Sequence, residues 1–256
     1  MLRLFERRTP GEPVGHIEVT NGGETFRVAL KRVSTSRRFT LRVRAATRDV
    51  LLTMPSRSSL QSAREFAERH AAWIGVRLAR LPRPVEFVPG SVTPFRGIDH
   101  TIVHRPGERG VAWIETGARG PLLCVSGDTP HVPRRVADFL KREAREDLQA
   151  AVSRHAKRLS VKPKRIVLRD TASRWGSCSS TGGLNFSWRL ILAPSHVLDY
   201  LAAHEVAHLI EMNHSTRFWR LVQRLCPGHE RAKAWLDVHG SDLHRYGLSD
   251  TGDALH

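Results

Sequence analysis

The stretch His204-Glu205-Val206-Ala207-His208 decides the fold that we expect for this chain. It has the pattern H-E-x-x-H, and on an α-helix His204 and His208 lie one turn apart on the same face. Two neutral imidazoles at this spacing bind one zinc ion, and Glu205 then stands beside the metal as a general base for a bound water. The pattern alone also arises by chance in a helix with two surface histidines. The surrounding residues must therefore show whether this stretch is a zinc site.

The helix that carries this pattern is expected to run over residues 196–212 and to be buried. Pro194 ends the preceding segment, and Ser195 can cap the helix. A helix that is apolar on most sides packs inside a protein, where a charge or a metal must be paired. Its histidines would therefore face a protected pocket. The apolar positions are Val197, Leu198, Tyr200, Leu201, Val206, Leu209 and Ile210.

His214 is the expected third ligand. A continuous helix would carry it away from the face of His208, so the helix must end and the chain must turn back. Asn213 tolerates the left-handed conformation that closes helices, and Ser215 can cap a new helix. Three histidines leave a fourth position for water, which is typical of a catalytic zinc site. Glu211 lies off the metal face, and four other residues remain alternatives for the third ligand, namely His229, Glu230, His239 and His244.

The composition is that of a globular protein with a basic surface. The chain has 256 residues, a formal net charge of +16 and three widely spaced cysteines. No apolar run approaches the roughly 20 residues of a membrane span, and the cysteine spacing favours a reducing cytoplasm over a disulfide framework. The charge indicates either a nucleic-acid partner or a solvated basic surface, and the even spread of basic residues favours the second interpretation.

We expect an α+β fold in which a β-rich region over residues 1–130 precedes a metallopeptidase core over residues 131–256. The β-rich region should be mainly antiparallel, because residues 26–30 and 39–43 alternate between apolar and polar side chains. Asn21-Gly22-Gly23 is a hairpin signal. Further strands are expected at 98–104, 111–115, 122–125, 165–170 and 184–192, and helices after Ser58 or Ser59 and over 133–160.

The histidine spacing matches the metzincin signature, but two other marks of that signature are missing. The glycine expected three residues after the second histidine is replaced by Glu211. A downstream Met-turn is impossible, because the methionines of the chain are Met1, Met54 and Met212. We therefore exclude a metzincin.

Four segments together resemble the YgjP-like family of zinc metallopeptidases: residues 174–179, residues 186–190, the H-E-x-x-H stretch, and Asn213-His214-Ser215 followed by Phe218-Trp219. The resemblance extends more weakly across nearly the whole chain. It implies zinc on His204, His208 and His214 with Glu205 as base. It also implies a compact zincin-like α+β peptidase core with a buried H-E-x-x-H helix, related to the SprT-like and WLM peptidases that cut DNA-bound protein.

In such a core a strand beside the active helix offers its edge to an extended peptide, and residues 184–192 are the expected strand. Arg174 would stabilise an oxyanion or bind a carboxylate or phosphate, or alternatively form a structural ion pair. The function expected is that of a cytoplasmic zinc metallopeptidase acting on protein or peptide. The alternatives are a metal-dependent nucleotide or phosphoanhydride hydrolase, and a protease acting on DNA-bound protein.

Overall fold

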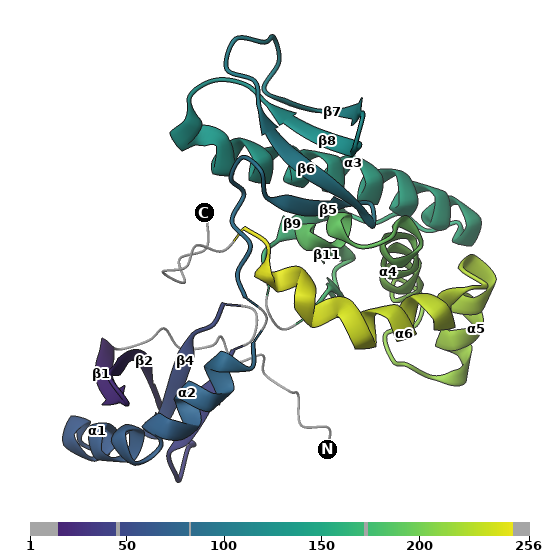
Figure 1. Cartoon of the computed structure of the whole chain (residues 1–256). Coiled ribbons are helices and arrows are strands. Elements are labelled where there is room, and N and C mark those ends of the chain that lie inside the picture. Colours follow the sequence, from purple (N-terminus) through teal and green to yellow (C-terminus); the bar gives the residue numbers. More distant parts are fainter. Residues whose placement is uncertain (1–14, 45–46, 82, 172–173, 248–256) are drawn as a thin grey trace. The chain divides into compact units, whose positions relative to one another are not determined.

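The computed structural model of the chain describes residues 15–44, 47–81, 83–171 and 174–247. Its contacts divide the chain into two compact units, residues 1–82 and residues 83–256 (Figure 1). Both units combine helices with β-sheet, so the chain is a mixed α+β protein, as its sequence predicts. No helix among the described residues is long and apolar enough to cross a membrane.

The first unit is a four-stranded sheet that packs on two helices. The sheet has the order β1-β2-β4-β3, in which β2 and β4 are parallel and the other pairs are antiparallel. The predicted hairpin at Gly22 and Gly23 joins its first two strands. Ser59 caps the first helix, since its Oγ accepts a hydrogen bond from the Ser62 amide at 3.0 Å. The elements are β1 (Gly15–Asn21), β2 (Glu24–Val33), β3 (Thr40–Val43), β4 (Val50–Pro55), α1 (Leu60–Arg69) and α2 (Ala71–Ala79).

The core of this unit follows from the period-two alternation of its strands. Apolar side chains on one face of the sheet are buried against small and apolar residues of the two helices. This core consists of Ile17, Val19, Phe26, Val28, Leu30, Val50, Leu52 and Met54 from the strands and Ala63, Ala67, Ala71 and Ile74 from the helices.

The second unit begins with a four-stranded sheet and a long helix, α3 (Val132–Leu159). The helix has a proline in its first turn, as the sequence predicts, and it contacts β7 and β8. These contacts place the second β-rich segment in the same compact unit as α3, so the contacts divide the chain near residue 82 rather than near residue 130. The strands are β5 (Val92–Phe95), β6 (Ile98–His104), β7 (Ala112–Gly117) and β8 (Gly120–Val125), in the order β5-β6-β8-β7.

A smaller sheet and three helices complete the second unit. The sheet has the order β10-β11-β9, and α4 contacts α3, α5, α6 and β10. These elements gather around α4 (Figure 1). Their bounds are β9 (Arg165–Arg169), β10 (Gly176–Cys178), β11 (Gly183–Ser187), α4 (Ser195–Ala207), α5 (Thr216–Leu225) and α6 (His229–His239), with short 3₁₀ helices at Thr129–His131, Trp188–Leu192 and Gly240–Arg245.

The strand predicted over 184–192 is shorter than expected, because the chain enters a 3₁₀ helix after Ser187. Ser187 caps this 3₁₀ helix, since its Oγ accepts a hydrogen bond from the Arg189 amide at 3.4 Å, and the Arg189 side chain in its first turn is only 3% exposed. Its guanidinium donates to both carboxylate oxygens of Asp170, at 2.8 and 3.1 Å, and to the carbonyl oxygens of Leu243 and Tyr246. A buried guanidinium requires such partners, and they lie far along the chain from the strand.

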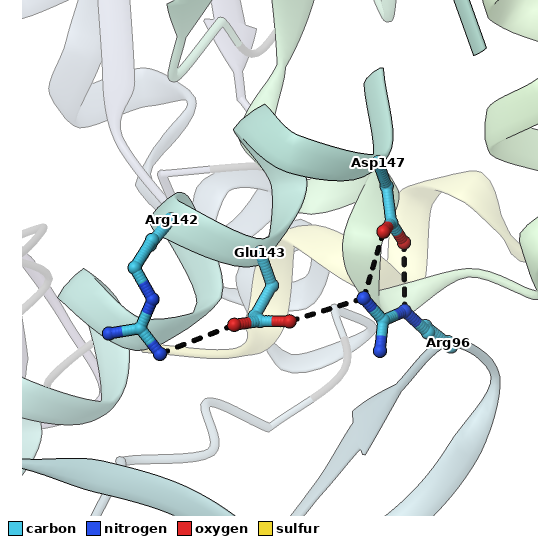
Figure 2. A network of polar contacts seen from close by, with 4 residues as sticks. All are labelled: Arg96, Arg142, Glu143 and Asp147. Atoms are coloured by element: carbon cyan, nitrogen blue, oxygen red, sulfur yellow. Dashed lines mark hydrogen bonds and ion pairs between the residues drawn. The ribbon is translucent and has the colours of Figure 1, made fainter. Parts of the chain in front are cut away.

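The β5–β6 hairpin is attached to α3 by an ion-pair network (Figure 2). The Arg96 guanidinium binds both carboxylate oxygens of Asp147 at 2.8 Å and Glu143 Oε2 at 3.1 Å. The Arg96 amide also donates to the carbonyl oxygen of Ile191 at 2.7 Å. The hairpin thereby holds the segment that leads into α4.

Replacing Gly97 by Ala should lower the free energy of unfolding by about 2–4 kcal/mol, from a strained backbone plus a steric clash. Gly97 has a φ of +79°, and a Cβ there would lie 2.7 Å from Pro194 Cα. Gly90, with a φ of +86° and no neighbour within 4 Å of its would-be Cβ, provides the matched control. Urea denaturation of both variants separates strain from clash. Equal losses would show that the contact with Pro194 contributes nothing.

Candidate metal centre

The last turn of α4 presents His204 and Glu205, and His208 is the residue that caps the helix. The predicted helix to Met212 is too long. The amides of Leu209 and Ile210 bond to carbonyls three residues back, at 3.1 Å each, so the chain leaves the helix in a tight turn. This early end turns the chain back beside α4 and brings His214 into reach.

Three histidine side chains converge at this point. One ring nitrogen from each of His204, His208 and His214 lies within 4.8 Å of the other two. The Nε2 atoms of His204 and His214 are 3.2 Å apart. The ring centroids are separated by 4.9 Å for His204 and His208, 5.1 Å for His204 and His214, and 4.8 Å for His208 and His214. The structure therefore brings together the three residues that the sequence nominates as ligands.

Phe218 is the platform on which the three imidazoles pack. Its fully buried ring stacks on His208 at 4.4 Å and meets His204 and His214 edge-on at 4.9 and 4.8 Å. The Phe218 amide donates to Ser215 Oγ at 3.2 Å, so the predicted Ser215 cap also fixes the start of α5. The sequence analysis placed Phe218 after the Ser215 cap but did not predict that its ring packs against the three histidines. The only signal for this was that Phe218 lies three residues after Ser215, close to His214.

The environment favours neutral imidazoles, the form that binds metals. Burial lowers the pKa of His204 to about 3, and the neighbouring His208 and His214 add to the effect. Burial also lowers the pKa of His208. The Nδ1–H group of His208 donates to the carbonyl oxygen of Glu211 at 3.0 Å, which leaves its Nε2 lone pair free. The donor set therefore fits a divalent ion with a preference for nitrogen ligands.

Glu205 directly follows His204 on α4 and is buried, with 3% of its surface exposed. Burial raises the pKa of its carboxyl group to about 8, against an opposing effect of Arg174. Its Oε2 has no hydrogen-bond partner among the described residues. Gly176 of β10 makes room for the side chain, since a Cβ at Gly176 would lie 2.8 Å from Glu205 Cγ.

The profile of the YgjP-like family, metallopeptidase domain, matches residues 37–239. The chain belongs to the YgjP-like metallopeptidase family. Among solved structures, the crystal structure of the metallopeptidase zymogen of Pyrococcus abyssi abylysin is similar over 39% of this chain and 97% of that chain, with 25% identity and a TM-score of 0.33. No curated protein matches the chain.

Membership of the YgjP-like family makes this protein a metallopeptidase, a hydrolase of peptide or protein substrates that works with a divalent metal. The other residues considered as third ligand lie outside the histidine cluster within the described chain. His229 stacks on Trp219, His239 lies against Trp235, and His244 stacks on Trp175. Glu230 is exposed on α6.

The strand expected to receive substrate is not an edge in this YgjP-like fold. β11, which contains residues 183–187, is the central strand and pairs with both β9 and β10. One edge of this sheet belongs to β10, which contacts α4 and passes Glu205 at Gly176. The sequence analysis expected no strand at β10. Arg174 is exposed just before β10, and its charge acts on Glu205.

Proposed function

We propose that this YgjP-like protein is a zinc-dependent peptidase of the zincin type in which His204, His208 and His214 hold the metal. The observation that carries the proposal is the convergence of three imidazoles beside a buried carboxylate. Three histidines suit zinc and leave a position open for catalysis. The catalytic part of the chain would lie within residues 131–256, with α4 as its buried active helix.

When bound, zinc supplies Lewis acidity, which polarises a carbonyl and makes water a stronger acid. Glu205 acts as the general base: its carboxylate accepts a proton from the attacking water and passes it to the leaving amine. The unpartnered Oε2 is available for this transfer. Gly176 keeps the carboxylate from being crowded by a side chain of β10.

The substrate would bind as an extended peptide along the free edge of β10, through main-chain hydrogen bonds. Arg174 lies at the start of this edge and would stabilise developing negative charge or bind a carboxylate. The three free cysteines, Cys124, Cys178 and Cys226, suit a reducing cytoplasm, where we place the protein.

Removal of the metal tests this function directly. The purified full chain should cleave an unfolded protein substrate, lose that activity with 1,10-phenanthroline, and regain it when zinc is restored. Cleavage that continues unchanged after complete metal removal would contradict a metal-dependent mechanism.

The same preparation tests the two alternatives that the net charge of +16 suggests. Phosphate release from nucleotides, in the absence of peptide cleavage, would favour a phosphoanhydride hydrolase. Cleavage that requires DNA, with binding that weakens steeply as salt rises, would favour action on DNA-bound protein.

A further inference from the structure

A groove of about 820 Å³ lies between α5 and α6. One wall is a stripe along α5 with helical spacing, which includes Thr216, Trp219, Arg220 and Arg224. The facing wall is a stripe along α6, which includes His229 and Lys233. Two helix faces that meet without filling the space between them leave room for a side chain from outside the protein.

The groove adjoins the candidate metal centre through Trp219. Thr216 comes shortly after His214 in the chain, and the Trp219 ring centroid lies 6.0 Å from those of both His204 and His214. On the groove side, Trp219 stacks on His229 at 5.8 Å. Trp219 is thus a shared wall, so a peptide held at the histidines can place a neighbouring residue in the groove.

His229 marks the groove as a polar site. It lines the groove, is 8% exposed, and its Nδ1 has no hydrogen-bond partner among the described residues. A buried polar atom without a hydrogen-bond partner is uncommon in a folded protein, and this one belongs to a residue of the groove lining.

The charged residues of the lining favour an anion. Arg220, Arg224 and Lys233 contribute three positive charges, and Glu230 and Asp237 contribute two negative ones, which leaves one positive charge in excess. Lys233 Nζ already pairs with Asp237 at 2.9 Å. Within the described chain, by contrast, neither Arg220 nor Arg224 is held in an ion pair. Each guanidinium carries the planar fork of N–H donors that binds a carboxylate, and Arg220 and Arg224 lie one helical turn apart on α5 in the groove lining.

We propose that this groove is a specificity site for a carboxylate of the peptide substrate, near the bond to be cut. The carboxylate belongs either to an Asp or Glu side chain or to the free C-terminus of a short peptide. Trp219 packs on the apolar part of the bound residue, and Arg220 and Arg224 bind its charged end. This inference rests on the proposed peptidase function and names the substrate chemistry that the site selects.

The test measures binding, so that it does not depend on cleavage. A fluorescein-labelled, alanine-rich hexapeptide with a central Glu is compared with its Gln counterpart, each with a free or an amidated C-terminus. Fluorescence anisotropy gives the dissociation constant of each peptide for two zinc-loaded proteins. One carries E205Q alone, and the other carries E205Q together with R220Q and R224Q. Combining E205Q with R231Q provides the control, because Arg231 is exposed on α6 outside the groove lining.

We expect the E205Q protein to bind a peptide that carries a carboxylate about fivefold more tightly than the amidated Gln peptide, which carries none. This is the size of effect that an exposed charge-assisted hydrogen bond gives. The Arg220 and Arg224 substitutions should abolish this preference, while the Arg231 control keeps it. A preference that follows the central Glu identifies a side-chain carboxylate, and one that follows the free C-terminus identifies a terminal carboxylate. Equal binding of all peptides, or a preference that survives both substitutions, overturns the inference even if the wild-type enzyme cleaves peptides.

Discussion

Replacing Glu205 by Gln should leave zinc bound and lower peptide cleavage by about 10²- to 10⁴-fold, the usual contribution of a general base. The amide has the shape of the carboxylate but cannot accept the proton of the attacking water. The metal should stay in place because the proposed ligands are His204, His208 and His214, and Glu205 is not among them. The neutral amide also removes a buried carboxylate, so the fold should not lose stability.

The measurement pairs zinc content with cleavage rate for the same protein sample. Glu211→Gln is the matched control, since the half-buried Glu211 side chain pairs with Arg217 at 4.0 Å and only its backbone oxygen contacts His208. Near-normal activity is expected for this control. Full activity of the Glu205 variant would show that another group accepts the proton.

Replacing His214 by Ala should have the next largest effect, a loss of zinc affinity. The loss should exceed the roughly 10–100-fold that follows when a residue hydrogen-bonded to a metal ligand is replaced. The His214 side chain is exposed and lies outside any helix, so its removal creates no buried cavity and the fold should persist. His204 and His208 would remain, but two imidazoles cannot fill three positions of a tetrahedral site.

Competition with a chromophoric chelator measures this affinity. His239→Ala is the control, because His239 is an exposed histidine at the end of α6 and lies against Trp235 rather than the cluster. An unchanged affinity in the His214 variant would mean that a different residue completes the site.

Local signals in the sequence were sufficient for most elements. The alternation over residues 26–30 predicted β2, and the cap residues Ser59 and Ser215 predicted the starts of α1 and α5. These features depend on side chains a few positions apart, where the period of the pattern and the capping hydrogen bond act directly. The spacing of His204 and His208 was readable for the same reason.

Features that depend on contacts between distant parts of the chain could not be predicted from local sequence patterns. The partners of the buried Arg189 after β11 include the carbonyls of Leu243 and Tyr246, far along the chain. The edge that we propose for the substrate is β10 rather than β11, because β11 is paired on both sides. Spacing alone also left both His214 and His229 as candidates for the third metal ligand. Only the early end of α4 places His214 beside His204.

The most direct test is an anomalous diffraction experiment at the zinc absorption edge on crystals of the full chain grown with zinc. A three-histidine site predicts one strong peak within bonding distance of ring nitrogens of His204, His208 and His214, with Glu205 beside it but not bound. A strong peak on other residues with none between these histidines, or a His214 ring turned away from the other two, would contradict it.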